Sequence, residues 1–242
     1  MTRRMPAVLD DTQAFPSPER ASPEGLLAIG GDLAPPRLLA AYRQGIFPWY
    51  SAGQPILWWS PDPRMVFRSD GVHLSSRFRR SLRASTWCVR ADTCFDTVVD
   101  ACAAPRAGQR GTWITPAMRR AYGALHRLGH AHSVEVFDGE GLVGGLYGVS
   151  VGTLFCAESM FSGESGGSKV ALAALAHRLR EWGWPLIDAQ VENEHLASLG
   201  GQPMPRSEFL AQVSVLSQRP HLPGAWTDRF GAMNARELGL GP

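Results

Sequence analysis

The sequence predicts an α+β protein with a small N-terminal α/β domain, residues 1–66, and a larger domain, residues 67–242, whose mixed sheet is flanked by helices. The chain has 242 residues, of which 44% are hydrophobic, so it can bury a core in one large domain or two small ones. An aromatic and proline-rich segment at 46–64 separates two stretches of regular pattern. After residue 115, helical and strand patterns alternate, which favours a mixed sheet covered by helices.

The N-terminal domain is expected to contain one helix among extended and irregular segments. Residues 1–20 show little periodicity and are interpreted as irregular. Pro35 and Pro36 open a helix, because proline fits the first helical turn, and Gly45 ends it. Segment 46–64 places three tryptophans among four prolines, which indicates an ordered, packed loop or a short edge strand rather than a linker.

The larger domain begins its regular pattern with a helix and three strands. Thr115 caps a helix that has Pro116 at its first position and ends at Gly129. Residues 133–137, 142–149 and 153–161 then read as antiparallel strands joined by glycine-containing turns.

A second helix and a further strand complete the expected order. Ser168 is expected to cap an amphipathic helix that ends at Gly183, before a strand at 186–190. The sequence therefore predicts the order helix, strand, hairpin, helix and strand around one mixed sheet.

Composition narrows the class of protein. No apolar run reaches the roughly 20 residues of a membrane span, and the N-terminus lacks the pattern of a signal peptide, so we expect a cytoplasmic protein without a membrane partner. The four cysteines lack Cys-x-x-Cys spacing and are interpreted as free thiols. His126, His130 and His132 match no known zinc spacing. We expect neither a metal nor a cofactor.

The net charge of +2 conceals a basic stretch. Between Arg64 and Arg90 the chain carries seven arginines against one acid, Asp70, a density typical of contact with a phosphate backbone. The alternative is a solvated helix face in a chain that prefers arginine to lysine. The arginines predicted to bind nucleic acid are Arg77, Arg80 and Arg83.

Two carboxylates interrupt apolar strands. Asp188 lies in Leu-Ile-Asp-Ala-Gln, where strand alternation places Asp188, Gln190 and Glu192 on one face. Glu158 interrupts another strand, on the expected face of Cys156 and Met160. If the two acids share a cleft, their charges couple and one of them can act as a general base near neutral pH. The alternatives are an ion pair that only holds the sheet together, or two unrelated structural acids.

The loop 162–169 precedes the second helix and superficially resembles a phosphate cradle. It lacks the spacing of a P-loop. Two interpretations stay open, an anion site at the helix N-terminus and a plain turn.

Ten ordered strings over residues 25–201 carry a family resemblance. They are GLLAIGGDL, AYRQGIFPW, ILWWSPDPR, TWITPAM, AHSVEVF, LVGGLYGVSVGTLF, ESMFS, SKVAL, LIDAQ and HLASLGG. The chain thereby resembles the leucyl/phenylalanyl-tRNA–protein transferases. This resemblance implies a GNAT-like acyltransferase domain behind a small N-terminal domain. It also implies transfer of Leu or Phe, and less well Met, from aminoacyl-tRNA to proteins with N-terminal Arg or Lys, which marks them for degradation.

The resemblance also implies roles for particular residues. The catalytic group would be Asp188, Gln190, Glu158 and Asn193. Trp49 and Trp113 would bind the adenosine at the tRNA 3′ end, since bases stack on aromatic rings. The pocket for the amino-acid side chain would be lined by Met160, Ile187, Leu146, Leu175 and Leu179. Asp188, acting through Gln190, would polarise the acceptor amine, and no covalent enzyme intermediate is required because the ester is already activated.

The chain departs from the family pattern in two places. Gly166-Gly-Ser-Lys169 replaces the usual Asn-Ala-Ser-Lys, which would loosen the loop, and several pocket positions are Leu, which would change the Leu-to-Phe preference. Two other functions remain in view. An acyl-coenzyme A transferase would hold pyrophosphate at the loop 163–168, and a noncatalytic RNA-binding module would use only the arginines and tryptophans.

Overall fold

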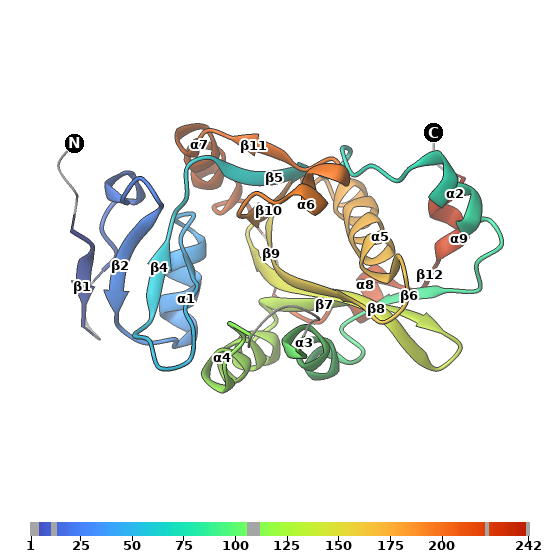
Figure 1. Ribbon diagram of the computed structural model, residues 1–242, viewed down its shortest axis with the longest axis horizontal. Coiled ribbons are helices and arrows are strands. Elements are labelled where there is room, and N and C mark those ends of the chain that lie inside the picture. The colour runs from blue at the N-terminus through green and yellow to red at the C-terminus, as the bar shows by residue number, and fades with distance from the viewer. Residues whose placement is uncertain (1–4, 11–13, 106–111, 221–222, 241–242) are drawn as a thin grey trace.

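The computed structural model describes residues 5–10, 14–105, 112–220 and 223–240. Within them lie two sheets, a smaller one with strand order β1-β2-β4-β3 and a larger one with order β11-β5-β10-β9-β8-β7-β6-β12 (Figure 1). The larger sheet is mixed and curled, and helices cover both of its faces. The predicted class, a mixed α+β chain with an N-terminal unit, is confirmed.

The N-terminal unit folds around one helix and the smaller sheet. Its elements are β1 (Ala7–Leu9), η1 (Pro18–Arg20), β2 (Leu26–Gly30), α1 (Pro35–Tyr42), β3 (Phe47–Pro48) and β4 (Leu57–Trp59). The predicted helix and the ordered aromatic segment are both present. The description of residues 1–20 as irregular was wrong at β1, which pairs in parallel with β2. This three-residue strand is too short to show a period in the sequence.

The larger sheet contains the three antiparallel strands that the sequence predicts. Its strands are β5 (Arg64–Arg68), β6 (Cys88–Ala91), β7 (Ala131–Asp138), β8 (Gly141–Val151), β9 (Leu154–Ser162), β10 (Leu186–Gln190), β11 (Gln202–Met204) and β12 (Met233–Asn234). Strands β7, β8 and β9 pair antiparallel in sequence order. Strand β10 then pairs in parallel with β9 and antiparallel with β5, which makes the sheet mixed.

Helices pack on the two faces of this sheet. They are α2 (Ser76–Leu82), α3 (Phe95–Ala103), α4 (Pro116–Arg127), α5 (Gly167–Glu181), α6 (Glu194–Ser198), α7 (Arg206–Leu216), α8 (Thr227–Phe230) and α9 (Ala235–Leu238). Helix α5 covers one face and connects β9 to β10, while α3 and α4 cover the other (Figure 1). Thr115 caps α4 through a hydrogen bond from the Met118 amide, as predicted. No helix in the described part of the chain is both long and apolar enough to cross a bilayer.

The start of α5 differs from the prediction. Gly166, not Ser168, is the N-cap, and its φ of 95° lies in the left-handed region that favours glycine. Ser168 lies inside the first turn, where its amide donates to Ser162 Oγ at 2.9 Å. A Cβ on residue 166 would lie 2.5 Å from the Phe78 ring, so the packing of α2 requires glycine at this position.

The boundary between the two units remains a proposal. The expected division at residue 66 crosses β5, which belongs to the larger sheet. One hydrophobic cluster spans both units and includes Trp58 and Tyr42 from the first and Tyr122 from the second. The two units therefore share a core.

Candidate active site

Asp188 lies at the centre of a buried ion pair. Arg64 Nε donates to Asp188 Oδ1 at 2.7 Å and Arg64 Nη2 donates to Oδ2 at 2.6 Å, and both side chains are 1% exposed. The Arg64 guanidinium also packs over the rings of Phe47 and Phe209, at 4.7 and 4.6 Å from their centroids. Arg64 is thus no part of the basic surface that the sequence predicts, because a buried carboxylate requires a partner.

Gln190 ends β10 in a strained backbone conformation. Its φ is 61°, and the pairing of β10 with β5 shifts register between Asp188 and Gln190. The Gln190 amide N–H donates to Asp188 Oδ1 at 2.9 Å. The expected alternation along 188, 190 and 192 therefore breaks between Asp188 and Gln190, and Glu192 is exposed after the strand has ended.

Glu158 occupies a bulge in β9. Tyr147 of β8 pairs with Ser159 and the next residue, Gly148, pairs with Ala157, so Glu158 has no opposite residue in the ladder. Because of the bulge, Cys156 and Met160 do not share one face of the strand with Glu158, contrary to the prediction from the sequence. Cys156 belongs to the hydrophobic cluster shared by the two units, whereas Met160 packs against a second hydrophobic cluster, which includes Leu146 and Leu175.

The Glu158 carboxylate accepts three hydrogen bonds. Tyr42 and Tyr122 each donate a hydroxyl at 2.7 Å, and Gln190 Nε2 donates at 2.9 Å. Burial raises the pKa of Glu158 to about 7, and the charge of Asp188 acts in the same direction, against the lowering effect of the hydrogen bonds. A carboxylate with this pKa can exchange a proton near neutral pH.

A cavity of about 490 Å³ opens beside these groups. Of the predicted catalytic residues, Glu158, Gln190 and Asn193 line it, whereas Asp188 does not. Of the predicted substrate-binding residues, Trp49, Trp113, Leu146 and Met160 line it. The structure therefore brings together residues of β8, β9 and β10 with Trp49, which follows β3, and with Trp113 and Asn193 from connecting segments.

Three predicted lining residues do not contact this cavity. Ile187, Leu175 and Leu179 are 0% exposed and belong to the second hydrophobic cluster. Leu172, which sequence reasoning missed, lines the cavity instead. Helix α5 is buried on most sides, so its apolar pattern does not identify the residues that face the cavity.

Two polar residues at the cavity, Asn193 and His195, have positions or contacts that the sequence analysis did not predict. Asn193 caps α6 by accepting the Leu196 amide at 2.9 Å, a role that the sequence analysis did not assign. His195 also lines the cavity and was missed, because a single histidine on a short helix gives no spacing signal.

Trp49 lies at the cavity with an exposed ring. Its side chain is 43% exposed, which is unusual for a large aromatic group. The Trp59 ring packs edge-on at 5.9 Å, and Trp59 Nε1 donates to the Trp49 carbonyl at 2.7 Å. The neighbouring indole thereby holds the Trp49 backbone in place while the Trp49 ring remains open to a ligand.

The predicted tRNA-binding arginines lie elsewhere. Arg77 and Arg80 are exposed on α2, and Arg83 follows it with Nε donating to the Gly239 carbonyl at 3.3 Å. Helix α2 lies beside α9, away from the cavity lining (Figure 1). The two regions could contact one ligand only if that ligand were large.

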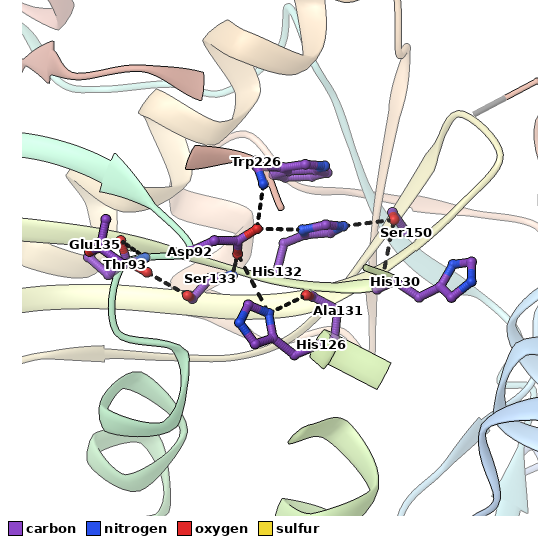
Figure 2. Close-up of polar contacts among 10 residues, drawn as sticks. All are labelled: Asp92, Thr93, His126, His130, Ala131, His132, Ser133, Glu135, Ser150 and Trp226. Carbon is purple, nitrogen blue, oxygen red and sulfur yellow. Dashed lines mark hydrogen bonds and ion pairs between the residues drawn. The ribbon is translucent and has the colours of Figure 1, made fainter. Parts of the chain in front are cut away.

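The three histidines considered for a metal do not converge. His132 and His126 both face Asp92, at 2.8 and 3.9 Å, while His130 points away from them (Figure 2). Among the described residues, no group of three or more potential ligands could hold a metal ion.

The start of α5 offers little to a pyrophosphate. The Gly167 amide donates to the Glu164 carbonyl at 3.0 Å, and the Ser168 amide to Ser162 Oγ. A Cβ on Gly144 would lie 2.4 Å from the Gly167 backbone, so β8 closes against the helix end. These contacts argue against an acyl-coenzyme A transferase and favour the plain turn.

Comparison with known proteins identifies the family of this chain. The model of the leucyl/phenylalanyl-tRNA protein transferase family matches residues 66–214, and that of its N-terminal domain matches residues 31–62. A protein of that name from Xanthomonas axonopodis pv. citri (strain 306) is 64% identical over 99% of this chain and 98% of its own length. Its counterpart from Xylella fastidiosa (strain 9a5c) is 63% identical over 93% of each chain. The chain therefore belongs to the leucyl/phenylalanyl-tRNA protein transferase family.

Proposed function

We propose that the protein is an aminoacyltransferase that moves Leu or Phe, and less well Met, from aminoacyl-tRNA to the N-terminal Arg or Lys of acceptor proteins. A new peptide bond forms, and the transferred residue at the N-terminus marks the acceptor for degradation in the cytoplasm. The observation that carries this proposal is the contact of Glu158 with Gln190 at the wall of an apolar cavity that an exposed tryptophan borders.

The chemistry requires a proton acceptor and a positioning group. The acceptor α-amine has an ordinary pKa near 8, so it must lose a proton to attack the ester. Gln190 Nε2 is held by Glu158, which leaves Gln190 Oε1 to accept a hydrogen bond from the amine. The amine nitrogen bonds to the ester carbonyl carbon, and Glu158 takes up the proton that this nitrogen loses. The bond to the ribose oxygen then breaks, and Glu158 returns the proton to that oxygen, which leaves as a ribose hydroxyl.

Asp188 has a different role in this scheme from the one that the sequence suggested. Its oxygens bind Arg64 and the backbone amide of Gln190, and its side chain does not reach the cavity. We propose that Asp188 positions Gln190 through the backbone, while Glu158 supplies the negative charge. Asn193, which also lines the cavity, would orient the substrate.

The cavity suits an aminoacylated adenosine. Stacking of the unpaired adenine on Trp49 and Trp113 would contribute roughly 1–3 kcal/mol per base and tolerate any tRNA body. Leu146, Met160 and Leu172 would hold a leucine or phenylalanine side chain. We also propose that the larger domain is GNAT-like, supported by the parallel pair β9 and β10 that α5 connects.

Transfer to a defined peptide tests the proposal. We expect radiolabelled Leu or Phe to pass from charged tRNA to a peptide that begins with Arg or Lys, and not to the same peptide beginning with Ala. Labelling of all peptides alike would contradict the proposed acceptor, and labelling of none would contradict the proposed activity.

The arginines of α2 give a separate prediction. Replacement of Arg77, Arg80 and Arg83 by Ala is expected to weaken binding of every tRNA to a similar degree and to flatten the dependence of affinity on salt. Contacts with phosphates carry no sequence information and release counterions, which explains both effects. Filter binding at several salt concentrations measures them. Unchanged affinity at low salt would exclude α2 from the interface.

A further inference from the structure

A second cleft lies away from the Glu158 cavity and shares no lining residue with it. Its volume is about 250 Å³, and its polar lining comes from Arg43, His130, Ser150, Ser217 and Arg219. These residues lie at the C-terminal ends of α1 and α7, after α4, and at the end of β8. We refer to it as the basic cleft.

A buried chain of hydrogen bonds ends at one wall of the basic cleft. His132 Nδ1 lies 2.8 Å from Asp92 Oδ2, and His132 Nε2 lies 3.1 Å from Ser150 Oγ (Figure 2). The His132 ring is stacked on Trp226 at 3.9 Å. The order resembles that of a serine hydrolase, but Ser150 is 0% exposed and its Oγ is already engaged by His132 Nε2 and by the His130 carbonyl at 3.4 Å.

The basic cleft carries excess positive charge. Arg43 is the C-cap of α1, and Arg219 lies two residues beyond the C-cap of α7, so each arginine faces a helix end with a partial charge of about −0.5. Two full charges against two half charges leave about +1. Burial and the nearby Arg43 lower the pKa of His130, so His130 adds no positive charge at neutral pH. No acidic side chain is among the described residues of the lining.

Ser217 supplies an independent sign of a ligand. Ser217 lines the cleft and is 8% exposed as a residue, and its Oγ is buried without a hydrogen-bond partner within the described parts of the chain. A buried hydroxyl without a partner is destabilising, and an acceptor atom in the cleft would relieve that cost.

We propose that the basic cleft binds a phosphate group between Arg43 and Arg219, with the Ser217 hydroxyl donating to one of its oxygens. Arginine suits this task because its planar guanidinium offers paired donors that match phosphate oxygens.

The backbone of the tRNA substrate is the source of phosphate that the structure favours. Tyr42, the neighbour of Arg43, donates to Glu158 in the candidate active site. Arg43 and Trp49 are six residues apart, so at most about 22 Å separates their backbones. A few nucleotides span such a distance. This assignment rests on the proposed function, whereas phosphate binding itself does not.

The test compares two double variants that remove the same charge. Arg43→Gln with Arg219→Gln changes the basic cleft, and Arg20→Gln with Arg180→Gln changes exposed arginines outside it. Affinity for an uncharged leucine tRNA is measured over a range of salt. We expect the cleft variant to bind several-fold more weakly and its salt slope to fall by roughly one, while the control keeps the wild-type slope.

A second experiment distinguishes binding of the tRNA backbone from binding of free inorganic phosphate. Isothermal titration calorimetry with inorganic phosphate is expected to show binding to wild type and to the control, and loss in the cleft variant. Loss of phosphate binding with an unchanged tRNA slope would overturn the RNA assignment. Identical behaviour of both double variants in both assays would overturn the site itself. If wild type binds phosphate but neither binds tRNA nor transfers an amino acid, the proposed function fails and the phosphate site stands.

Ser217→Ala provides a readout without a change of charge. If the hydroxyl contacts phosphate, its loss is expected to weaken tRNA binding at every salt concentration and to leave the slope intact. Unchanged binding together with higher stability would mean that the hydroxyl has no ligand, which would contradict this part of the proposal.

Discussion

Replacement of Arg64 by Met is expected to lower the free energy of unfolding by about 3–5 kcal/mol, because it leaves Asp188 buried without a charged partner. Both members of the pair are 1% exposed, so water cannot replace the lost contact. Methionine retains apolar packing against Phe47 and Phe209, so the variant removes the charge and the hydrogen bonds of Arg64, including the one from Nη1 to the Gly45 carbonyl at 3.1 Å. Urea unfolding measures the effect.

The chain provides a matched control on the same strand. Arg68 lies four residues further along β5, is 67% exposed and pairs with Asp70 at 3.3 Å. Arg68→Met is expected to change stability by no more than about 0.5 kcal/mol, since surface ion pairs contribute little. Equal losses in the two variants would contradict the account of the buried pair.

A second variant tests the cause of the loss. Asn at position 188 carries no charge but retains an oxygen for the Gln190 amide, whose bond to Asp188 is 2.9 Å long. Adding Asp188→Asn to Arg64→Met is therefore expected to recover much of the lost stability. No recovery would indicate that packing of Arg64, rather than charge, dominates.

Glu158→Gln is expected to lower the rate of transfer by about 10²–10⁴-fold, the range typical of losing a general base. Glutamine has the same shape and keeps one acceptor oxygen, and its NH2 group can donate to the second tyrosine hydroxyl, so we expect the fold to remain. Single-turnover transfer of Leu from charged tRNA to an Arg peptide measures the rate. Glu192→Gln, which changes an exposed acid beyond the end of β10, is expected to keep the wild-type rate.

The dependence on pH identifies the group. Burial raises the pKa of Glu158 to about 7, so the reactive carboxylate accumulates as pH rises through that value. The acceptor amine titrates near pH 8 in both enzymes. The ratio of the wild-type rate to the variant rate is therefore expected to increase with a midpoint near pH 7. A ratio that does not change with pH would exclude proton transfer by Glu158.

Measurement of the stability of Glu158→Gln distinguishes a loss of catalysis from a folding defect. Because the pKa of Glu158 is raised on folding, its protonated form stabilises the native state below the ordinary value of 4.5, and this contribution is lost as pH rises through about 7. At pH 8, Glu158→Gln is thus expected to unfold at the same urea concentration as wild type or a higher one. A marked loss of stability there would point to a structural role.

Local pattern was sufficient for much of the fold. Proline and glycine delimited α1, a Thr-Pro pair delimited α4, and alternation found β7, β8 and β9. The same alternation identified Glu158 and Asp188 as acids that a strand does not ordinarily bury. These features depend on residues close together in the chain.

Local sequence patterns could not predict the arrangement of the candidate site. Arg64 and Asp188 are 124 residues apart, and they meet only because β5 and β10 become neighbours in the sheet. The bulge at Glu158 arises from register between strands, which no single strand encodes. For the same reason the sequence did not distinguish Leu172 from Leu175 as the residue at the cavity.

The sequence by itself thus determined which elements form and which acids are unusual, because caps, breakers and periodicity act over a few residues. Tertiary structure alone decided that Asp188 is neutralised by Arg64 while Glu158 faces the cavity. The physical reason is that the state of a carboxylate depends on burial and on charges from distant segments, and only the folded chain brings these together.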